Sequence, residues 1–199
     1  MGLSKLEAVN IILDSIGETP VSSLDSGLPD AEAAETKLNE INKTVQAKGW
    51  HQNTEKSLKL TPDSNSNIVV PPSYLRIDTT DNSKSINVTP RTFDNKSMLY
   101  DVKKQSYVFT NDLYCNIVLL LPYEDLTLEL SNYIAYRAAR KFQEAQMQST
   151  TLDGFTVRGE MEAYAALMDA ETENEDTNIL TDNEHCWYTT NRNHRMIGY

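Results

Sequence analysis

The sequence predicts an α+β fold in which helical segments at both ends of the chain enclose a central region of short strands. Before residue 55 and after residue 122, apolar residues recur every three or four positions, which is the spacing of one face of a helix. Between residues 56 and 121 they alternate with polar residues, as in half-buried strands. Because the two patterns are segregated along the chain, we expect an α+β fold and not a βαβ repeat.

We therefore expect three parts. Residues 1–55 and 122–175 form a helical domain that resembles a four-helix bundle. Residues 56–121 form an inserted β domain, either an antiparallel sheet or a small barrel, whose strand order the sequence leaves open. Residues 176–199 form an extended C-terminal arm, because they contain few aliphatic residues and many Asn and Thr.

The first helix begins with Ser4 and Glu7, at the spacing of a capping box in which each side chain binds the other residue's backbone N–H. Its apolar stripe is Leu6, Val9, Leu13 and Ile16, and Gly17 ends it. With the second helix it forms a helical hairpin.

The second helix follows Pro29 and ends before Gly49, which suits the left-handed backbone position just past a helix. Trp50 then folds back onto Val45. We predict that Gly49 and Trp50 are a structural anchor between the helices and the sheet. The apolar stripe of this helix is narrow and needs another surface to cover it: Ala31, Ala34, Leu38, Ile41 and Val45.

In the central region we predict strands at 57–60, 67–70, 74–77, 85–88, 107–109 and 116–121, with turns at 79–84 and 94–97. A third helix is expected at 123–147, with a buried face of Leu126, Leu130, Ile134, Ala138 and Phe142. Its basic residues Arg137, Arg140 and Lys141 lie late, where they match the helix dipole. A fourth helix is expected at 152–173, with a buried face of Val157, Met161, Tyr164, Ala165 and Met168.

Composition excludes several classes of protein. A net charge of −11 and a pI near 4.7 argue against a protein that grips nucleic acid or an anionic membrane surface. No apolar run approaches the length needed to cross a bilayer. Cys115 and Cys186 lie far apart, and we expect reduced thiols in a soluble protein made in a cytoplasm.

The search for chemistry predicts no catalytic, metal-binding or cofactor-binding residue. His185, Cys186 and His194 lack the paired spacing of a zinc site, and no phosphate-binding glycine loop occurs. Seven carboxylates between 169 and 184 include Glu171 and Glu175, which could pair as in a glycosidase. We expect a solvated acidic face instead, because nothing there would separate two pKa values.

The arm carries three large aromatic residues in a polar context: Trp187, Tyr188 and Tyr199. Isolated aromatic residues of this kind often anchor protein interfaces, so we predict a partner contact there. A disordered tail is the alternative.

Several motifs, in the same order along the chain, resemble the tail tubular protein A group of T7-like short-tailed bacteriophages. None is diagnostic alone, and the group often has Pro where this chain has Thr127. The arm beyond about residue 181 carries no matching motif. The motifs are Ala8-Val9-Asn10, Ile16-Gly17-Glu18, Gly49-Trp50, Leu60-x-Pro62-Asp63, Leu121-Pro122-Tyr123-Glu124-Asp125-Leu126, Arg137-Ala138-Ala139-Arg140 and Asn178-Ile179-Leu180.

The resemblance implies a structural, non-enzymatic adaptor between head and tail. It implies a dodecameric ring below the portal protein, with a nozzle protein similar to tail tubular protein B on the far side. DNA passes through without specific binding, no membrane is contacted and no cofactor is needed. The adaptor would belong to the virion tail and assemble in the bacterial host cytoplasm. Two alternatives remain: a carbohydrate-cleaving tail hydrolase that uses Glu171 and Glu175, and a soluble interaction module unrelated to phages.

Overall fold

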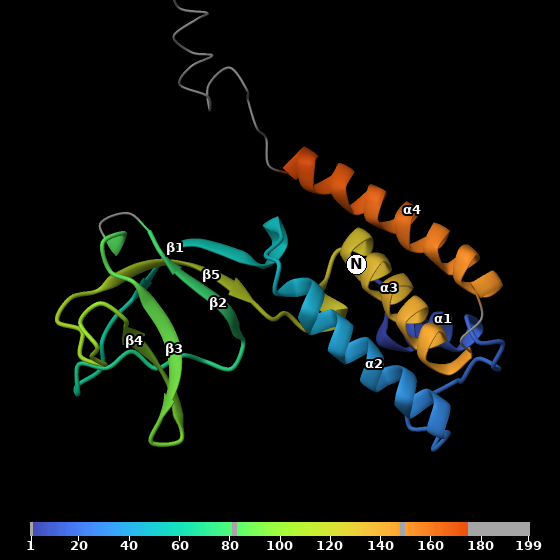
Figure 1. The fold of residues 1–199 in the computed structure, drawn as a ribbon, viewed down its shortest axis with the longest axis horizontal. Coiled ribbons are helices and arrows are strands. Elements are labelled where there is room, and N and C mark those ends of the chain that lie inside the picture. The colour runs from blue at the N-terminus through green and yellow to red at the C-terminus, as the bar shows by residue number, and fades with distance from the viewer. Residues whose placement is uncertain (1, 81–82, 148–149, 175–199) are drawn as a thin grey trace, which may run out of the picture.

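The computed structural model describes residues 2–80, 83–147 and 150–174. This part of the chain contains four α-helices and two antiparallel sheets (Figure 1). The helices are α1 (Lys5–Asp14), α2 (Pro29–Gln46), α3 (Leu128–Met147) and α4 (Thr150–Asn174). Helix α3 contacts the other three. The sheets lie between α2 and α3 in the sequence, which confirms the predicted α+β class with an inserted β region.

The larger sheet has the strand order β1-β5-β2, and the smaller one is a hairpin of β3 and β4. The chain enters this region through β1 and leaves it through β5, and these neighbouring strands pair Thr54 with Val118. Because entry and exit lie side by side, the β region can be inserted into the helical part without separating α2 from α3. The strands are β1 (Thr54–Leu60), β2 (Tyr74–Thr79), β3 (Val88–Phe93), β4 (Lys96–Asp101) and β5 (Leu113–Leu119).

The start of α1 and the end of α2 follow the predicted local chemistry. Ser4 Oγ accepts a 3.2 Å hydrogen bond from the Glu7 N–H, and Glu7 Oε2 accepts a 2.8 Å bond from the Ser4 N–H. The Ser4 hydroxyl, which donates to Glu7 Oε2 at 2.7 Å, and the Ser4 N–H together hold the pKa of the Glu7 carboxyl below its usual value. Past the end of α2, Gly49 has a φ of +82°, a conformation that favours glycine.

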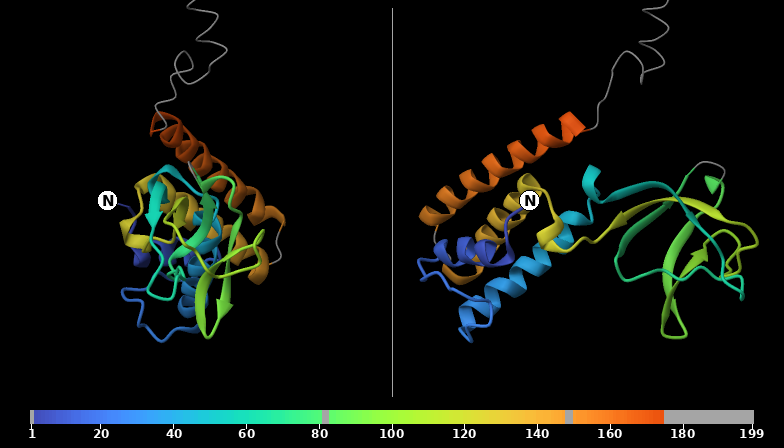
Figure 2. Two further views of the ribbon diagram at one scale, coloured as in Figure 1. Left: turned by 90° about the vertical axis from the view of Figure 1, so that its left-hand side faces the viewer. Right: turned by 180° about the vertical axis from the view of Figure 1, so that it is seen from behind.

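Two separate hydrophobic cores hold the molecule together. The helical core buries the five predicted stripe residues of α2 and the predicted face of the third helix, together with Val9 and Leu13 of α1. The second core fills the β region around Leu99, Leu113, Cys115 and Ile117. Figure 2 shows the resulting elongated shape, with the helices at one end and the strands at the other.

The third helix begins five residues later than predicted. Tyr123–Asp125 form a short 3-10 helix, and Leu126 is extended, with a φ of −75° and a ψ of 155°. The side chain of Gln52 holds this break, since its Nε2 donates to the Asp125 carbonyl oxygen and its Oε1 accepts from the Thr127 N–H. A single helix from residue 123 would remove these bonds.

Three predicted strands are wrong. Residues 67–70 make only one bridge, between Val69 and Met98, because Pro71 and Pro72 cannot donate to a ladder. Residues 107–109 are irregular although Phe109 is buried, and only Val88 of 85–88 is in a strand. The sequence prediction missed the β3–β4 ladder, although the predicted turn between 94 and 97 is correct: Asp94 and Asn95 have φ values of 49° and 57°.

Candidate assembly surfaces

Two buried amides join the end of α2 to the end of β5. Gln46 Nε2 donates to the carbonyl oxygen of Leu121 at 2.9 Å, and Gln46 Oε1 accepts from the Leu121 N–H at 2.8 Å. Asn53 Nδ2 donates to the carbonyl oxygens of Leu119 at 2.7 Å and Gln46 at 3.0 Å. Since both side chains are buried, these bonds fix where the strands leave the helices. The sequence analysis assigns neither residue a structural role, because the sequence does not show whether a polar side chain is buried.

Gly49 and Trp50, the predicted anchor, lie at this same junction. The Trp50 side chain is buried in the helical core, and its Nε1 donates a 2.9 Å hydrogen bond to the Val45 carbonyl oxygen. A Cβ on Gly49 would lie 2.9 Å from Arg76 Nη2 and 3.0 Å from Val118 Cγ2. The chain thus passes between the helices and the sheet with no room for a larger residue at Gly49.

Helix α4 packs on α3 through a partly buried carboxylate. Glu160 accepts bonds from Arg137 Nη1 at 3.2 Å and from Arg140 Nη1 at 3.0 Å, and its side chain is 13% exposed. Lys141 pairs instead with Glu144 at 2.7 Å. The predicted role of these basic residues at the helix dipole is wrong, because α3 extends beyond them to Met147 and they form ion pairs.

The predicted buried face of α4 is also wrong. Leu167 is 1% exposed and faces the core, whereas Met161 is 66% exposed, Tyr164 40% and Met168 39%. Because Glu160 turns inward to its arginine partners, the helix is rotated away from the predicted orientation. We call Met161, Tyr164 and Met168 the α4 stripe. They follow the i, i+3, i+7 spacing of one helix face, so they present a continuous apolar surface.

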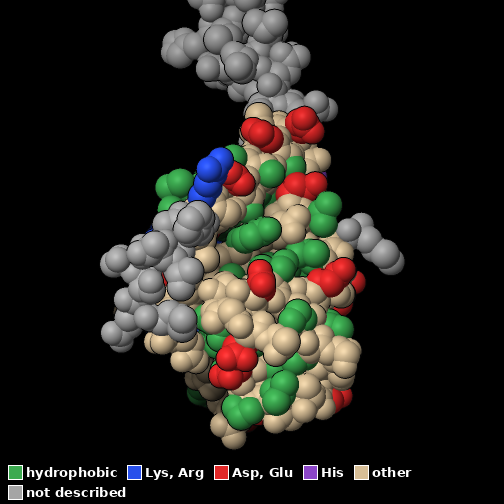
Figure 3. All heavy atoms as spheres, turned by 90° about the vertical axis from the view of Figure 1, so that its right-hand side faces the viewer, with side chains coloured by type: hydrophobic (Ala, Val, Ile, Leu, Met, Phe, Trp, Pro, Cys, Tyr) green, Lys and Arg blue, Asp and Glu red, His purple; other side chains and the backbone are tan. Residues whose placement is uncertain are grey.

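Acidic residues border the α4 stripe. Glu162, Asp169 and Glu173 are all exposed, and their spacing of seven and four residues places them on one side of α4. Figure 3 shows the helical end of the molecule, where hydrophobic side chains lie among Asp and Glu and few Lys or Arg are in view. These acidic residues lie along one side of the stripe only, since Lys48 Nζ lies 5.9 Å from the centre of the Tyr164 ring on another side. A surface that combines exposed apolar groups with charged groups at its edge is typical of a protein-binding site.

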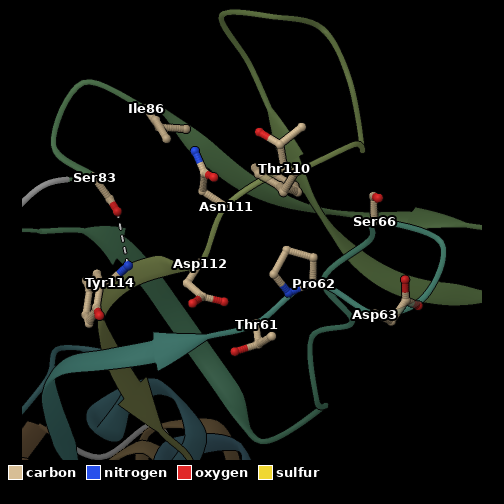
Figure 4. Close-up of a pocket in the computed structure, with 11 residues that line it drawn as sticks. Thr61, Pro62, Asp63, Ser66, Ser83, Ile86, Thr110, Asn111, Asp112 and Tyr114 are labelled. Atoms are coloured by element: carbon tan, nitrogen blue, oxygen red, sulfur yellow. Dashed lines mark hydrogen bonds between the residues drawn. The ribbon is translucent and has the colours of Figure 1, made fainter.

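A pocket at the far end of the β region contains two carboxylates, Asp63 and Asp112 (Figure 4). Asp63 Oδ1 accepts 2.9 Å bonds from the N–H groups of Asn65 and Asn67. Asp112 forms a 2.8 Å ion pair with Lys59, and this hydrogen bond holds the pKa of the Asp112 carboxyl below its usual value. Asp112 is therefore ionised at neutral pH and cannot act there as a general acid.

Cys115 is a small buried residue of the β core, as the sequence predicts, and burial raises the pKa of its thiol to about 11. Within the described ranges, no three His, Cys, Asp or Glu side chains are grouped closely enough to hold a metal ion. None of the described helices combines the length and the apolar character that a membrane span requires.

Comparison with known proteins decides the family. The model of the family described as tail tubular protein matches residues 6–177, which includes all four helices apart from Lys5 and both sheets. The chain belongs to the tail tubular protein family. A relative described as tail tubular protein A, from Klebsiella phage KP34, is 25% identical over 134 residues. The matched segment covers 67% of this chain and 68% of that protein.

As a tail tubular protein, the chain is a structural component of a phage tail that assembles with other tail components. The family assignment agrees with the resemblance that the sequence motifs indicate. The family is structural and not enzymatic.

The remaining predicted site residues lie outside the described part of this tail tubular protein. They are Trp187, Tyr188 and Tyr199 of the arm. The zinc-site candidates that the sequence argues against, His185, Cys186 and His194, and Glu175 of the hydrolase alternative also lie outside it. Of the two carboxylates that a hydrolase would need, Glu171 is described. Its Oε2 accepts a 2.8 Å hydrogen bond from the His51 N–H, so it ties the end of α4 to the junction beside Trp50.

Proposed function

We propose that this tail tubular protein is a ring-forming adaptor between head and tail. In this proposal twelve copies form a ring that joins the portal protein to the tail nozzle and lines part of the path through which DNA is ejected. The ring is a virion component that assembles in the bacterial host cytoplasm. The α4 stripe carries the proposal, because it is an exposed apolar surface of the kind that a partner chain covers.

Each subunit of the proposed ring has two domains, one around each hydrophobic core. We propose that residues 1–55 and 122–175 are one domain and residues 56–121 a second, with Gly49 and Trp50 as the anchor between them. Support comes from the separate hydrophobic clusters and from the bonds of Gln46 and Asn53 across the junction. A ring needs subunits of fixed shape, and a junction with buried hydrogen bonds supplies that shape.

The charge suits a conduit for DNA. With a net charge of −11, the chain repels phosphate groups on balance, so DNA would slide past without a tight site. For the arm we propose a contact with a neighbouring tail component through Trp187, Tyr188 and Tyr199, the aromatic residues that the sequence analysis singles out.

We propose no catalytic role. The hydrolase alternative needs a carboxyl group with a raised pKa in an apolar cleft. Glu171 instead accepts a backbone hydrogen bond at the junction, and the pKa of Asp112 in the pocket of the β region is lowered, not raised. The described carboxylates therefore favour a structural role over hydrolysis.

Mass photometry of the purified protein, alone and mixed with the portal protein of the same phage, tests the adaptor role. We expect a complex with the portal that contains many copies of this chain. A variant in which Met161 and Met168 are both replaced by Glu should bind the portal less well or not at all. Exposed Thr36→Glu and Thr44→Glu on α2 serve as the control. Failure of the wild-type protein to join the portal would overturn the proposal.

A further inference from the structure

The charge of the chain is distributed unevenly between its two parts. Residues 51–121 contain eight Lys or Arg and seven Asp or Glu, which gives a net charge of +1. The rest of the chain contains ten Lys or Arg and 22 Asp or Glu, a net charge of −12. The inserted β region is therefore the least acidic part of the molecule, and it attracts acidic surfaces that the helical part repels.

Within the β region, one face of the β3–β4 hairpin gathers aromatic and basic side chains. The Arg91 guanidinium lies 3.9 Å from the centre of the Tyr100 ring. The ring centres of Tyr100 and Tyr107 are 4.9 Å apart, as are those of Phe93 and Tyr107. Phe93 is 53% exposed, so this aromatic cluster is open to solvent.

The register of the hairpin places the cluster on a single face. Arg91 pairs with Met98 and Phe93 with Lys96, and residues two apart on a strand share a face. Val69 bridges to Met98 and is 50% exposed. Leu99 lies on the opposite face and fills the β core. We call Arg91, Phe93, Lys96, Tyr100, Tyr107 and Val69 the hairpin face.

The hairpin face and the α4 stripe match in chemistry. One combines aromatic rings with Arg91 and Lys96. The other combines two methionines and a tyrosine with a row of carboxylates along one side, Glu162, Asp169 and Glu173. Sulfur and aromatic groups attract one another, and opposite charges across an interface select the partner.

The β3–β4 hairpin lies in the β region at one end of the molecule and points away from α4, whose C-terminal end reaches the middle of the long axis (Figures 1 and 2). One copy therefore cannot bring its own hairpin face onto its own α4 stripe. Two different surfaces on one chain are the requirement for a head-to-tail contact, which closes into a ring when the rotation between copies permits.

We infer that the hairpin face of one copy docks on the α4 stripe of the next copy. The partner is thus a second copy of this chain. The inference rests on the proposed function and deepens it, because it names the surfaces through which neighbouring subunits meet. The exposed aromatic cluster and the exposed stripe then cover each other, which explains why a single chain leaves both open to solvent.

Charge reversal on each face tests the contact. Arg91→Glu with Lys96→Glu makes the hairpin face acidic, and Asp169→Lys with Glu173→Lys makes the border of the α4 stripe basic. We expect each pair to weaken assembly on the portal about tenfold or more, since like charges then face each other. The chain with all four changes keeps the net charge of −11 and should assemble to within about threefold of the wild type.

The matched control is Lys56→Glu with Lys84→Glu, two exposed residues of the β region outside the hairpin face. It changes the net charge as much as the hairpin pair and should leave assembly unchanged. If the control weakens assembly equally, or if the four changes together restore nothing, the inference is overturned. Assembly of both reversed pairs at the wild-type level would remove the inference but leave the adaptor role intact. Failure of the wild type on the portal would instead remove the adaptor role.

Cross-linking gives a readout that does not depend on how well reversed variants fold. In a background of Cys186→Ser, Phe93→Cys chains are mixed with Met168→Cys chains, assembled on the portal and treated with a short thiol cross-linker. Peptide mass spectrometry should find residues 93 and 168 joined, and no link when Thr36→Cys replaces Met168→Cys. Absence of the 93–168 link in assembled rings overturns the inference. Binding to duplex DNA is measured for the wild type and for the Arg91→Glu, Lys96→Glu variant. If the variant loses DNA binding while its assembly is unchanged, the hairpin face binds DNA and the inference is overturned.

Discussion

The side-chain amide of Gln46 pairs with both backbone groups of Leu121, at 2.9 Å and 2.8 Å, in the way that one strand pairs with another. Gln46 Nε2 also donates to Asn42 Oδ1 at 2.8 Å. Gln46 is completely buried, so water could not replace its side chain as the hydrogen-bond partner of Leu121. This contact sets the position at which the sheet leaves the helices.

Gln46→Leu should therefore destabilise the protein strongly although the two side chains are similar in size. It leaves the N–H and C=O of Leu121 without their side-chain partner, and we expect a loss of about 2–4 kcal/mol in the free energy of unfolding. Chemical denaturation followed by circular dichroism measures it. Gln146→Leu at an exposed position of α3 should change stability by less than about 0.5 kcal/mol. Equal effects would show that the Leu121 contact contributes nothing.

Gly49→Ala should be more harmful than Gly27→Ala. Both glycines have positive φ values, +82° and +68°, so each substitution costs about 1 kcal/mol of backbone strain. At Gly27 nothing lies within 4 Å of an added Cβ, whereas at Gly49 the Cβ meets Arg76 and Val118. We expect a further loss of about 1–2 kcal/mol at Gly49. Thermal denaturation of the two variants side by side decides it, and indistinguishable melting temperatures would contradict the tight junction.

The local signals in the sequence predicted the helices well because each rests on neighbouring residues. The Ser4–Glu7 capping box, the stripe of α2 and the turn near Asp94 all depend on contacts within a few positions. The face of α4 could not be predicted in the same way. Apolar residues occur around much of that helix, and Glu160 points inward only because Arg137 and Arg140 of α3 are there to receive it.

The hairpin face escaped prediction for a related reason. Strand β3 carries Pro90, Arg91 and Thr92 in succession, which gives no alternation of apolar and polar residues. Its ladder with β4 comes from the turn geometry, and its aromatic cluster includes Tyr107 from a loop that no strand pattern describes. The junction amides Gln46 and Asn53 are likewise defined by partners about 65–75 residues away.

The two proposed domains should respond separately to damage in their cores. Leu99→Ala opens a cavity in the β core, and Leu38→Ala opens one in the helical core, each at a side chain with no solvent exposure. Hydrogen exchange followed by mass spectrometry should show faster exchange confined to β1–β5 for Leu99→Ala. For Leu38→Ala the increase should be confined to α1–α3. Faster exchange throughout the chain in both variants would mean one cooperative unit and would contradict the division.

Acid should weaken the contact between Asp112 and Lys59. The pKa of Asp112 is lower in the folded protein than in the unfolded chain, so the stabilisation is present above the unfolded pKa and is lost as the pH falls through the folded pKa. Between about pH 6 and about pH 3 the melting temperature should therefore fall more for the wild type than for Asp112→Asn. Parallel curves for the two proteins would show that this ion pair does not contribute to stability.

The adaptor role requires that this chain binds the portal protein as a ring. Electron cryomicroscopy of the portal protein incubated with the full chain should show a closed ring of twelve copies on one end of the portal, with the α4 stripe covered by a neighbouring chain. A portal without bound density, or a chain bound to it with the α4 stripe facing solvent, would contradict the account.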